Sequence, residues 1–211
     1  MGDRYAELKE IVINGKRDDA TALLQEMLNG GEDPKKIIDG SLIPAMDVVG
    51  ENFQKNVFFI PELLVAARAM EGCLKILEPL LKKGDVKPVG KAMACTVKGD
   101  LHDIGKNIVA AMLKGAGFEI VDLGNDADPA KIAAAVAEHS PDILCLSALL
   151  TTTMRNMKDT IQALEQKGVR GKVKVMVGGA PLTQKYADEI GADAFGRDAA
   201  EAVKKARELI A

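Results

Sequence analysis

A short charged loop in the middle of the sequence carries the residues best suited to chemistry. Asp100, His102 and Asp103 stand close together there, and Gly105 follows. His102 is one of only two histidines in the chain. The loop follows an apolar run, residues 89–97, that is typical of a buried strand, and it leads into a segment with apolar residues at helical spacing. Because parallel sheets bind ligands at the carboxyl ends of their strands, this loop is a candidate binding site.

The spacing in this loop allows three interpretations. A phosphate-binding loop is disfavoured, because five residues separate its glycines where four are needed, and Asn107 replaces the Ser or Thr that would hold magnesium. A surface histidine in a helix N-terminal turn, capped by Asp100 or Asp103, is the second interpretation. In the third, His102 binds a metal while a carboxylate holds its other ring nitrogen, which fixes the tautomer and raises the basicity of the ligand.

The metal interpretation requires a cofactor. A bare zinc ion takes about four ligands, and no cysteine or second histidine lies near His102 in the sequence. The other histidine, His139, precedes Ser140-Pro141 and is predicted to end a surface helix. A lone histidine ligand makes sense when the metal arrives in a cofactor that fills its other positions.

Asp100-x-His102-x-x-Gly105 resembles the signature of cobalamin-binding domains. The wider run KGDLHDIGKNIV, residues 98–109, is similar to the methyltransferase branch of that family, as in methionine synthase and the small corrinoid proteins of methanogens and acetogens. Two further motifs of the family occur downstream in order, and the resemblance covers nearly the whole chain. It implies a cobalamin or related corrinoid bound base-off. His102 would be the lower ligand of cobalt, and Asp100 would hold the His102 ring.

The resemblance also implies roles for residues outside this loop. Thr153, where many relatives have Ser, would complete a hydroxyl–carboxylate–histidine relay through Asp100. Phe59 and Leu63 would cover the upper, methyl-bearing face of the corrin, although packing within a helical bundle explains each of them singly. Further cofactor contacts are expected at Asp103, Ile104, Gly105, Ser147, Leu149, Thr151, Gly178 and Gly179. Turn chemistry alone would also account for the small residues at strand ends, and a helix cap is the preferred interpretation of Asp103.

The N-terminal part is predicted to be helical. Four amphipathic helices with short connections occupy residues 5–79 and indicate a small bundle. Asp33-Pro34 is typical of a helix start, and Pro44 is expected to kink or split the helix that begins there. The segment Gly84–Gly90 combines glycine, proline and charge. It predicts a domain boundary between residues 1–87 and 88–211. The resemblance implies that the first is a helical bundle cap and the second a cobalamin-binding domain.

The second part alternates between strands and helices. Five apolar strands separated by helices predict an α/β domain with a parallel, flavodoxin-like (Rossmann-like) sheet of order 2-1-3-4-5. In that order the loops after the first, third and fourth strands meet at one edge of the sheet. The His102 loop is therefore expected beside residues 147–153 and 178–181.

Composition limits the possible partners and location. The chain of 211 residues is 47% hydrophobic and 3% aromatic, with a net charge of -3. Without a basic excess, nucleic acid is not an expected partner. Cys73, Cys95 and Cys145 lie in apolar contexts that favour buried free thiols. No apolar run is long enough to span a bilayer, so the protein is expected to be cytoplasmic and free of membrane.

The resemblance implies a free-standing methyl carrier that is not a complete enzyme alone. A donor methyltransferase would place a methyl group on Co(I), and an acceptor methyltransferase would move it from methyl-Co(III) to a folate, pterin or thiol. A reductive activase is a further expected partner. Two alternatives are a cobalamin-dependent sensor, which usually adds a DNA-binding segment and a tryptophan in the cap, and the small subunit of a mutase, which lacks the cap. The sequence has no tryptophan, and its helical first part, residues 1–84, argues against the mutase.

Overall fold

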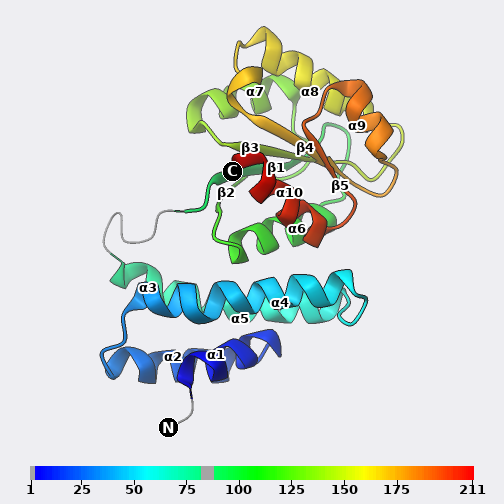
Figure 1. Cartoon of the computed structure of the whole chain (residues 1–211). Helices are drawn as coiled ribbons and strands as arrows, with labels where there is room; N and C mark the ends of the chain where they lie inside the picture. Colours follow the sequence, from blue (N-terminus) through cyan, green and yellow to red (C-terminus); the bar gives the residue numbers. More distant parts are fainter. Residues whose placement is uncertain (1–2, 82–87) are drawn as a thin grey trace. The chain divides into compact units, whose positions relative to one another are not determined.

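The computed structural model describes residues 3–81 and 88–211. The chain forms two compact units, one of helices and one built on a β-sheet (Figure 1). Residues 84–87 of the predicted boundary segment, Gly84–Gly90, lie outside the described residues. Within the described chain, no helix combines the length and the apolar character that crossing a membrane requires.

The helical unit contains the four predicted helices, the third of them interrupted. Its elements are α1 (Arg4–Ile13), α2 (Arg17–Asn29), α3 (Pro34–Ile37), the π-helical turn η1 (Ile38–Leu42), α4 (Ile43–Gln54), α5 (Ile60–Leu77) and the 3₁₀ turn η2 (Glu78–Leu80). Asp33 caps α3 by accepting a hydrogen bond from the Lys36 N–H at 3.0 Å, with Pro34 at the start of the helix. The predicted interruption is the π turn just before Pro44, because proline has no N–H to continue the helical bonding.

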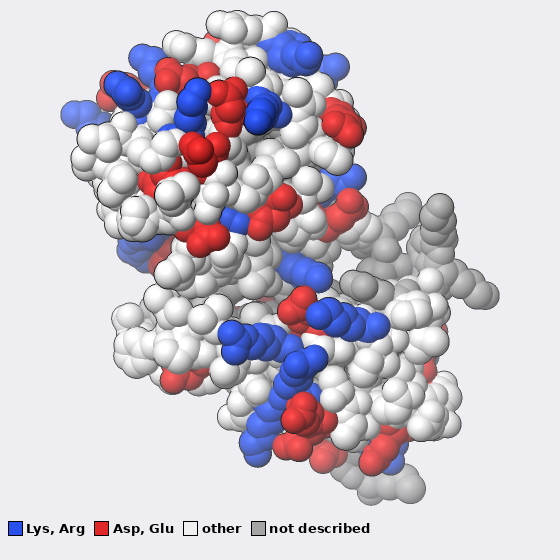
Figure 2. All heavy atoms as spheres, turned by 180° about the vertical axis from the view of Figure 1, so that it is seen from behind, with Lys and Arg blue, Asp and Glu red and all other residues white. Residues whose placement is uncertain are grey.

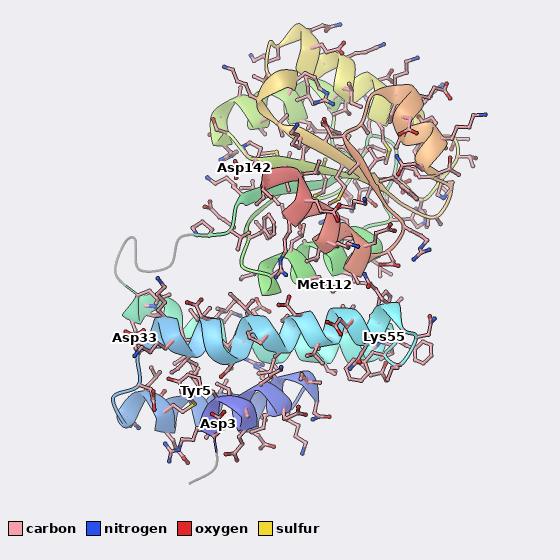
Figure 3. The ribbon with its side chains drawn as sticks, viewed as in Figure 1. Asp3, Tyr5, Asp33, Lys55, Met112 and Asp142 are labelled. Carbon is pink, nitrogen blue, oxygen red and sulfur yellow. The ribbon has the colours of Figure 1, made fainter. Side chains whose placement is uncertain are left out.

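The core of the helical unit consists mainly of aliphatic side chains and methionine. Leu8, Leu24, Met27 and Leu42 are fully buried, which agrees with a composition poor in aromatic residues. Asp3 caps α1 by accepting a hydrogen bond from the Tyr5 N–H at 3.0 Å, as Asp33 caps α3; Figure 3 labels all three of these residues.

The second unit is a five-stranded sheet in the order β2-β1-β3-β4-β5, with every pairing parallel. The prediction of a flavodoxin-like sheet is confirmed. Its elements are β1 (Lys91–Thr96), α6 (Ile104–Gly115), β2 (Glu119–Asp122), α7 (Pro129–His139), β3 (Ile143–Ser147), α8 (Arg155–Gln166), η3 (Arg170–Lys172), β4 (Lys174–Gly178), α9 (Gln184–Ile190), β5 (Ala194–Gly196) and α10 (Ala199–Ile210). Helices α7, α8 and α9 cover one face of the sheet, and α6 and α10 cover the other (Figure 1).

Strand register brings the ends of the central strands level. Thr96 of β1 pairs with Ser147 of β3, and Ser147 pairs with Gly178 of β4. At the opposite edge, Asp142 (labelled in Figure 3) accepts a hydrogen bond from the Lys91 N–H at 2.7 Å and fixes the starts of β1 and β3. The loops after β1, β3 and β4 therefore open on the same edge, as the strand order predicted.

Two other sequence predictions can be checked against the fold. Cys73, Cys95 and Cys145 are all buried free thiols, as their apolar contexts indicated. Their pKa values are raised, to about 11 for Cys73 and about 12 for the two strand cysteines, because burial disfavours the thiolate. His139 is the exposed last residue of α7, as predicted.

Surface charge is mixed rather than segregated. On the face shown in Figure 2, cationic and anionic side chains intermingle over both units. This agrees with a composition of 28 Lys and Arg residues against 31 Asp and Glu residues.

Candidate functional site

The residues predicted to form a relay do meet in the structure. Asp100 is fully buried. Its Oδ1 accepts a hydrogen bond from the His102 backbone N–H at 3.1 Å and lies 2.8 Å from Nδ1 of the His102 ring. Its Oδ2 accepts bonds from the Thr153 hydroxyl at 2.7 Å and from the N–H groups of Leu149 at 2.8 Å and Leu150 at 3.2 Å. The β1–α6 and β3–α8 loops are thus joined through one carboxylate.

These hydrogen bonds determine the charge of Asp100. Burial alone would raise the pKa of the Asp100 carboxyl, but hydrogen bonds from the Thr153 hydroxyl, the Leu149 N–H and His102 outweigh burial and hold this pKa well below its usual range. Asp100 is therefore ionised near neutral pH and can only accept hydrogen bonds.

An ionised Asp100 in turn fixes the tautomer of the histidine ring. Since Oδ1 can only accept, the proton between Asp100 and His102 belongs on Nδ1. In the neutral ring, Nε2 then carries a free lone pair. The His102 side chain is 53% exposed, and among the described residues no hydrogen bond to Nε2 is present. The site offers one oriented, solvent-facing nitrogen ligand, the arrangement expected from the metal interpretation.

Local turn chemistry builds the His102 loop. Gly99 has φ +79°, a left-handed conformation that glycine adopts without strain, and the Asp100 N–H closes the turn on the Val97 carbonyl at 3.1 Å. The Asp103 carbonyl then accepts the first helical bond of α6, from the Asn107 N–H at 2.8 Å. The side-chain cap predicted for Asp103 does not form, since no described residue donates a hydrogen bond to its carboxylate.

Exposed apolar side chains stand beside His102 in sequence and in the β3–α8 loop that Asp100 joins to it. They are Leu101, Leu149 and Leu150 of the two joined loops and Ile104, the first residue of α6, and each is between 40% and 72% exposed. Large apolar residues gathered at an open site indicate a surface that an apolar ligand covers. Gly105 adds room, because a Cβ placed there would meet no heavy atom within 4 Å. The protein's own packing therefore does not explain the glycine.

The small residues after β3 and β4 have a different explanation. Gly179 has φ +135°, and a Cβ there would lie 1.9 Å from the Ala148 carbonyl oxygen. A Cβ on Gly178 would lie 3.1 Å from the Gly196 carbonyl oxygen. Close approach of neighbouring backbones thus accounts for both glycines. The channel predicted between Ser147, Gly178 and Gly179 for a cofactor tail stays a prediction.

The remaining predicted residues lie as follows. Thr151 is exposed in the β3–α8 loop, two residues before the Thr153 that contacts Asp100. Phe59 stands directly before α5 in the helical unit and is 61% exposed, whereas Leu63, in the first turn of α5, is fully buried. Burial of Leu63 agrees with a place in the bundle core. A contact of either residue with a cofactor stays a prediction.

Sequence reasoning missed a buried lysine near the site. Lys106, in the first turn of α6, is 4% exposed. Its Nζ lies 2.7 Å and 2.6 Å from the two carboxylate oxygens of Asp122 at the end of β2, and 2.6 Å from Oδ1 of Asn107. This ion pair links the start of α6 to the end of β2. Its only signal in the sequence is a lysine within an otherwise apolar helical segment.

Two models of a B12 binding domain match the sequence, one over residues 90–204 and the other over residues 4–78. The chain belongs to the B12-binding family. Dimethylamine corrinoid protein 1 of Methanosarcina mazei is 42% identical to it, over 97% of this chain and 94% of its own.

Solved structures give the same family and fold. A cobalamin-binding protein from Desulfitobacterium hafniense is similar with a TM-score of 0.81 and 31% identity, over 99% of both chains. One chain of the methanol:cobalamin methyltransferase complex of Methanosarcina barkeri is similar with a TM-score of 0.86 and 33% identity, over 96% of this chain and 78% of that chain.

The side chains of this site fit the cofactor of that family. Among the described residues, no group of three or more His, Cys, Asp or Glu side chains could hold a bare metal ion. A corrin ring brings the equatorial ligands of its own metal, so it needs one nitrogen and an apolar platform from the protein. The oriented Nε2 of His102 provides the nitrogen, and the exposed side chains of Leu101, Ile104, Leu149 and Leu150 provide apolar surface.

Proposed function

We propose that this protein is a corrinoid methyl carrier. It receives a methyl group from a donor methyltransferase and presents it to an acceptor methyltransferase, which passes it to a folate, pterin or thiol. The observation that carries the proposal is the Nε2 of His102, held in one orientation by an ionised, buried Asp100. The names of the relatives support a role in methyl transfer, since they include a dimethylamine corrinoid protein and a methanol:cobalamin methyltransferase complex.

In this proposal His102 is the lower axial ligand and the cofactor is bound base-off. When a corrinoid is bound, its cobalt supplies the centre that takes up and releases the methyl group. Asp100 keeps Nδ1 protonated and the ring aimed, and Thr153 keeps Asp100 in place. When Nε2 is not bound to metal, it faces solvent.

Other residues complete the proposed site. The corrin ring lies beside His102 and contacts Asp103, Ile104, Gly105 and Leu149. The nucleotide tail of the cofactor is bordered by Ser147, Thr151, Gly178 and Gly179. Phe59 and Leu63 belong to a cap domain of residues 1–87 and cover the methyl-bearing face, while residues 88–211 form the cobalamin-binding domain. A reductive activase restores the reduced cofactor after adventitious oxidation.

Absorption spectroscopy of the loaded protein tests this function. The purified chain is incubated with hydroxocobalamin, freed of unbound cofactor, reduced, and treated with methyl iodide as a chemical methyl donor, with spectra taken in the dark and after illumination. We expect equimolar binding and a spectrum that responds to the methyl donor in the dark. The His102→Ala variant should lose the histidine-ligated spectrum, and His139→Ala, the matched control, should keep it.

Two results would contradict the proposal. A protein that binds no cobalamin is not a corrinoid carrier. A protein that binds cobalamin but responds to light with a change in oligomeric state, and not to the methyl donor, is a sensor.

A further inference from the structure

The segment between β2 and α7 lies along the His102 loop, backbone to backbone. The Thr96 N–H donates to the Gly124 carbonyl at 2.9 Å, and the Ala127 N–H donates to the Thr96 carbonyl at 3.0 Å. Val97 and Ala127 form an isolated parallel bridge. This segment therefore extends the β1–β2 pairing beyond the strands, up to the start of the loop that carries His102.

Asp126 contacts the His102 loop at two points. Its Oδ1 accepts a hydrogen bond from the Gly99 N–H at 2.7 Å, and its own N–H donates to the Asp100 carbonyl at 3.1 Å. These two groups are the opposite ends of the Gly99–Asp100 dipeptide. Asp126 has φ +50°, a left-handed conformation that is uncommon for residues other than glycine but is tolerated by Asp and Asn.

The two sides of Asp100 are thus held by different segments. Its side chain is held by the β3–α8 loop, through Leu149, Leu150 and Thr153. Its backbone is held by Asp126. The ring of His102 has one hydrogen-bond partner among the described residues, which is Oδ1 of Asp100. A shift of the Asp100 backbone must therefore move the acceptor that aims the ring.

We propose that Asp126 is a positioning residue for His102. It acts through Asp100, by fixing the Gly99–Asp100 dipeptide so that Oδ1 stays within reach of Nδ1. The value of this orientation to a cofactor rests on the proposed function, but the orientation itself is a property of the chain alone. Partners behind a metal ligand typically change affinity or activity by roughly 10–100-fold when they are removed.

Three variants isolate the contribution of the Asp126 side chain. Asp126→Gly keeps the left-handed backbone at no steric cost and removes the acceptor. Asp126→Asn keeps both a side-chain oxygen and tolerance of this conformation, so it should behave as the wild type. Lys98→Gln is the matched control: it removes another side-chain link between the same two segments, the exposed Lys98–Asp128 ion pair of 2.8 Å.

The first readout is the tautomer of the two histidines in the cofactor-free full chain, from nitrogen-15 NMR of the imidazole rings. Wild type, Asp126→Asn and Lys98→Gln should show a single Nδ1–H tautomer for His102, with exposed His139 as internal reference. In Asp126→Gly, the nitrogen-15 signals of His102 should shift toward an average over the Nδ1–H and Nε2–H tautomers, the pattern expected for exposed His139. An unchanged His102 pattern in folded Asp126→Gly would overturn the proposal.

The second readout is the affinity for hydroxocobalamin, which should fall about tenfold in Asp126→Gly, the lower end of the range for such partners, and should not change in Lys98→Gln. If the wild type binds no cobalamin, the proposed function fails while the tautomer still tests Asp126. If Asp126→Gly does not fold, the test is made on the wild type instead, by measuring the rate of hydrogen exchange of the Gly99 amide. Strong protection of this amide supports the contact with Asp126, and exchange as fast as that of an exposed loop amide overturns the proposal.

Discussion

Thr153→Val is expected to destabilise the sheet unit by removing one hydrogen bond to a buried charge. Valine keeps the shape and β-branching of threonine but has no hydroxyl. The Thr153 hydroxyl lies 2.7 Å from Asp100 Oδ2, and a hydrogen bond to a charged group contributes about 1.5–3 kcal/mol net. Asp100 keeps the Leu149 and Leu150 N–H groups on the same oxygen. We therefore expect a loss near the middle of that range, about 2 kcal/mol.

Thr160→Val is the matched control on the adjoining helix. Thr160 is fully buried in α8, and its hydroxyl donates to the Asn156 carbonyl one turn earlier at 2.7 Å. This bond joins neutral groups within one helix, so its removal should cost no more than about 1 kcal/mol. The free energy of unfolding can be measured in urea from the NMR ring signals of His102 and His139, which both report on the sheet unit.

The pH dependence separates a bond to a carboxylate from ordinary packing. The folded-state pKa of Asp100 is depressed, so the stability it contributes is fully present above the unfolded carboxyl pKa of about 3.9 and is lost as pH falls toward the folded value. Removing the Thr153 hydroxyl lets this folded pKa rise. The difference between wild type and Thr153→Val should therefore narrow below about pH 4, while the effect of Thr160→Val stays constant. Equal and pH-independent losses in both variants would refute the relay.

Three further changes follow from the geometry. Gly179→Ala should lower the free energy of unfolding in urea by at least about 2 kcal/mol, because of the positive φ and the close backbone contact at this position. Gly171→Ala, whose Cβ would meet nothing within 4 Å, should change it by no more than about 0.5 kcal/mol; equal losses of stability would contradict the close contact at Gly179. Lys106→Met should cost about 1–3 kcal/mol. Lys55→Met breaks the exposed Lys55–Glu51 ion pair of 3.1 Å and should cost at most about 0.5 kcal/mol; a neutral Lys106→Met would show that the buried ion pair adds no stability. Phe59→Ala should leave cobalamin binding through His102 nearly intact and speed photolysis of the methylated cofactor, and an unaltered photolysis rate would argue against a covering role.

The regular elements were predictable because local signals agreed with the tertiary structure. Residues 89–97 were predicted as a strand, and β1 occupies Lys91–Thr96. Pro44 marked the interruption before α4. The parallel order then placed the loops after β1, β3 and β4 at one edge, so the strand ends could be aligned without coordinates. Strong apolar periods and Gly or Pro punctuation carry this information within short windows.

The supports of the site were not predictable in the same way. The contact of Asp100 with His102 spans two residues and came from a motif, whereas Lys106 and Asp122 stand 16 residues apart and Gly99 and Asp126 stand 27 apart. Such pairs exist only once the strands are in register, and neither has a local sequence pattern. The reason for Gly179 was equally hidden, since the Ala148 carbonyl that excludes a side chain there lies about 30 residues earlier in the chain, directly after β3.

Electron paramagnetic resonance of the Co(II) state tests the central claim most directly. The protein is produced with nitrogen-15 histidine, loaded with unlabelled cobalamin and reduced by one electron. One axial nitrogen from His102 predicts that the triplet splitting seen with natural histidine becomes a doublet with the label, and that His139→Ala behaves identically while His102→Ala loses the splitting. A triplet that persists in the labelled protein would place the cofactor's own benzimidazole on cobalt and contradict the proposed role of His102.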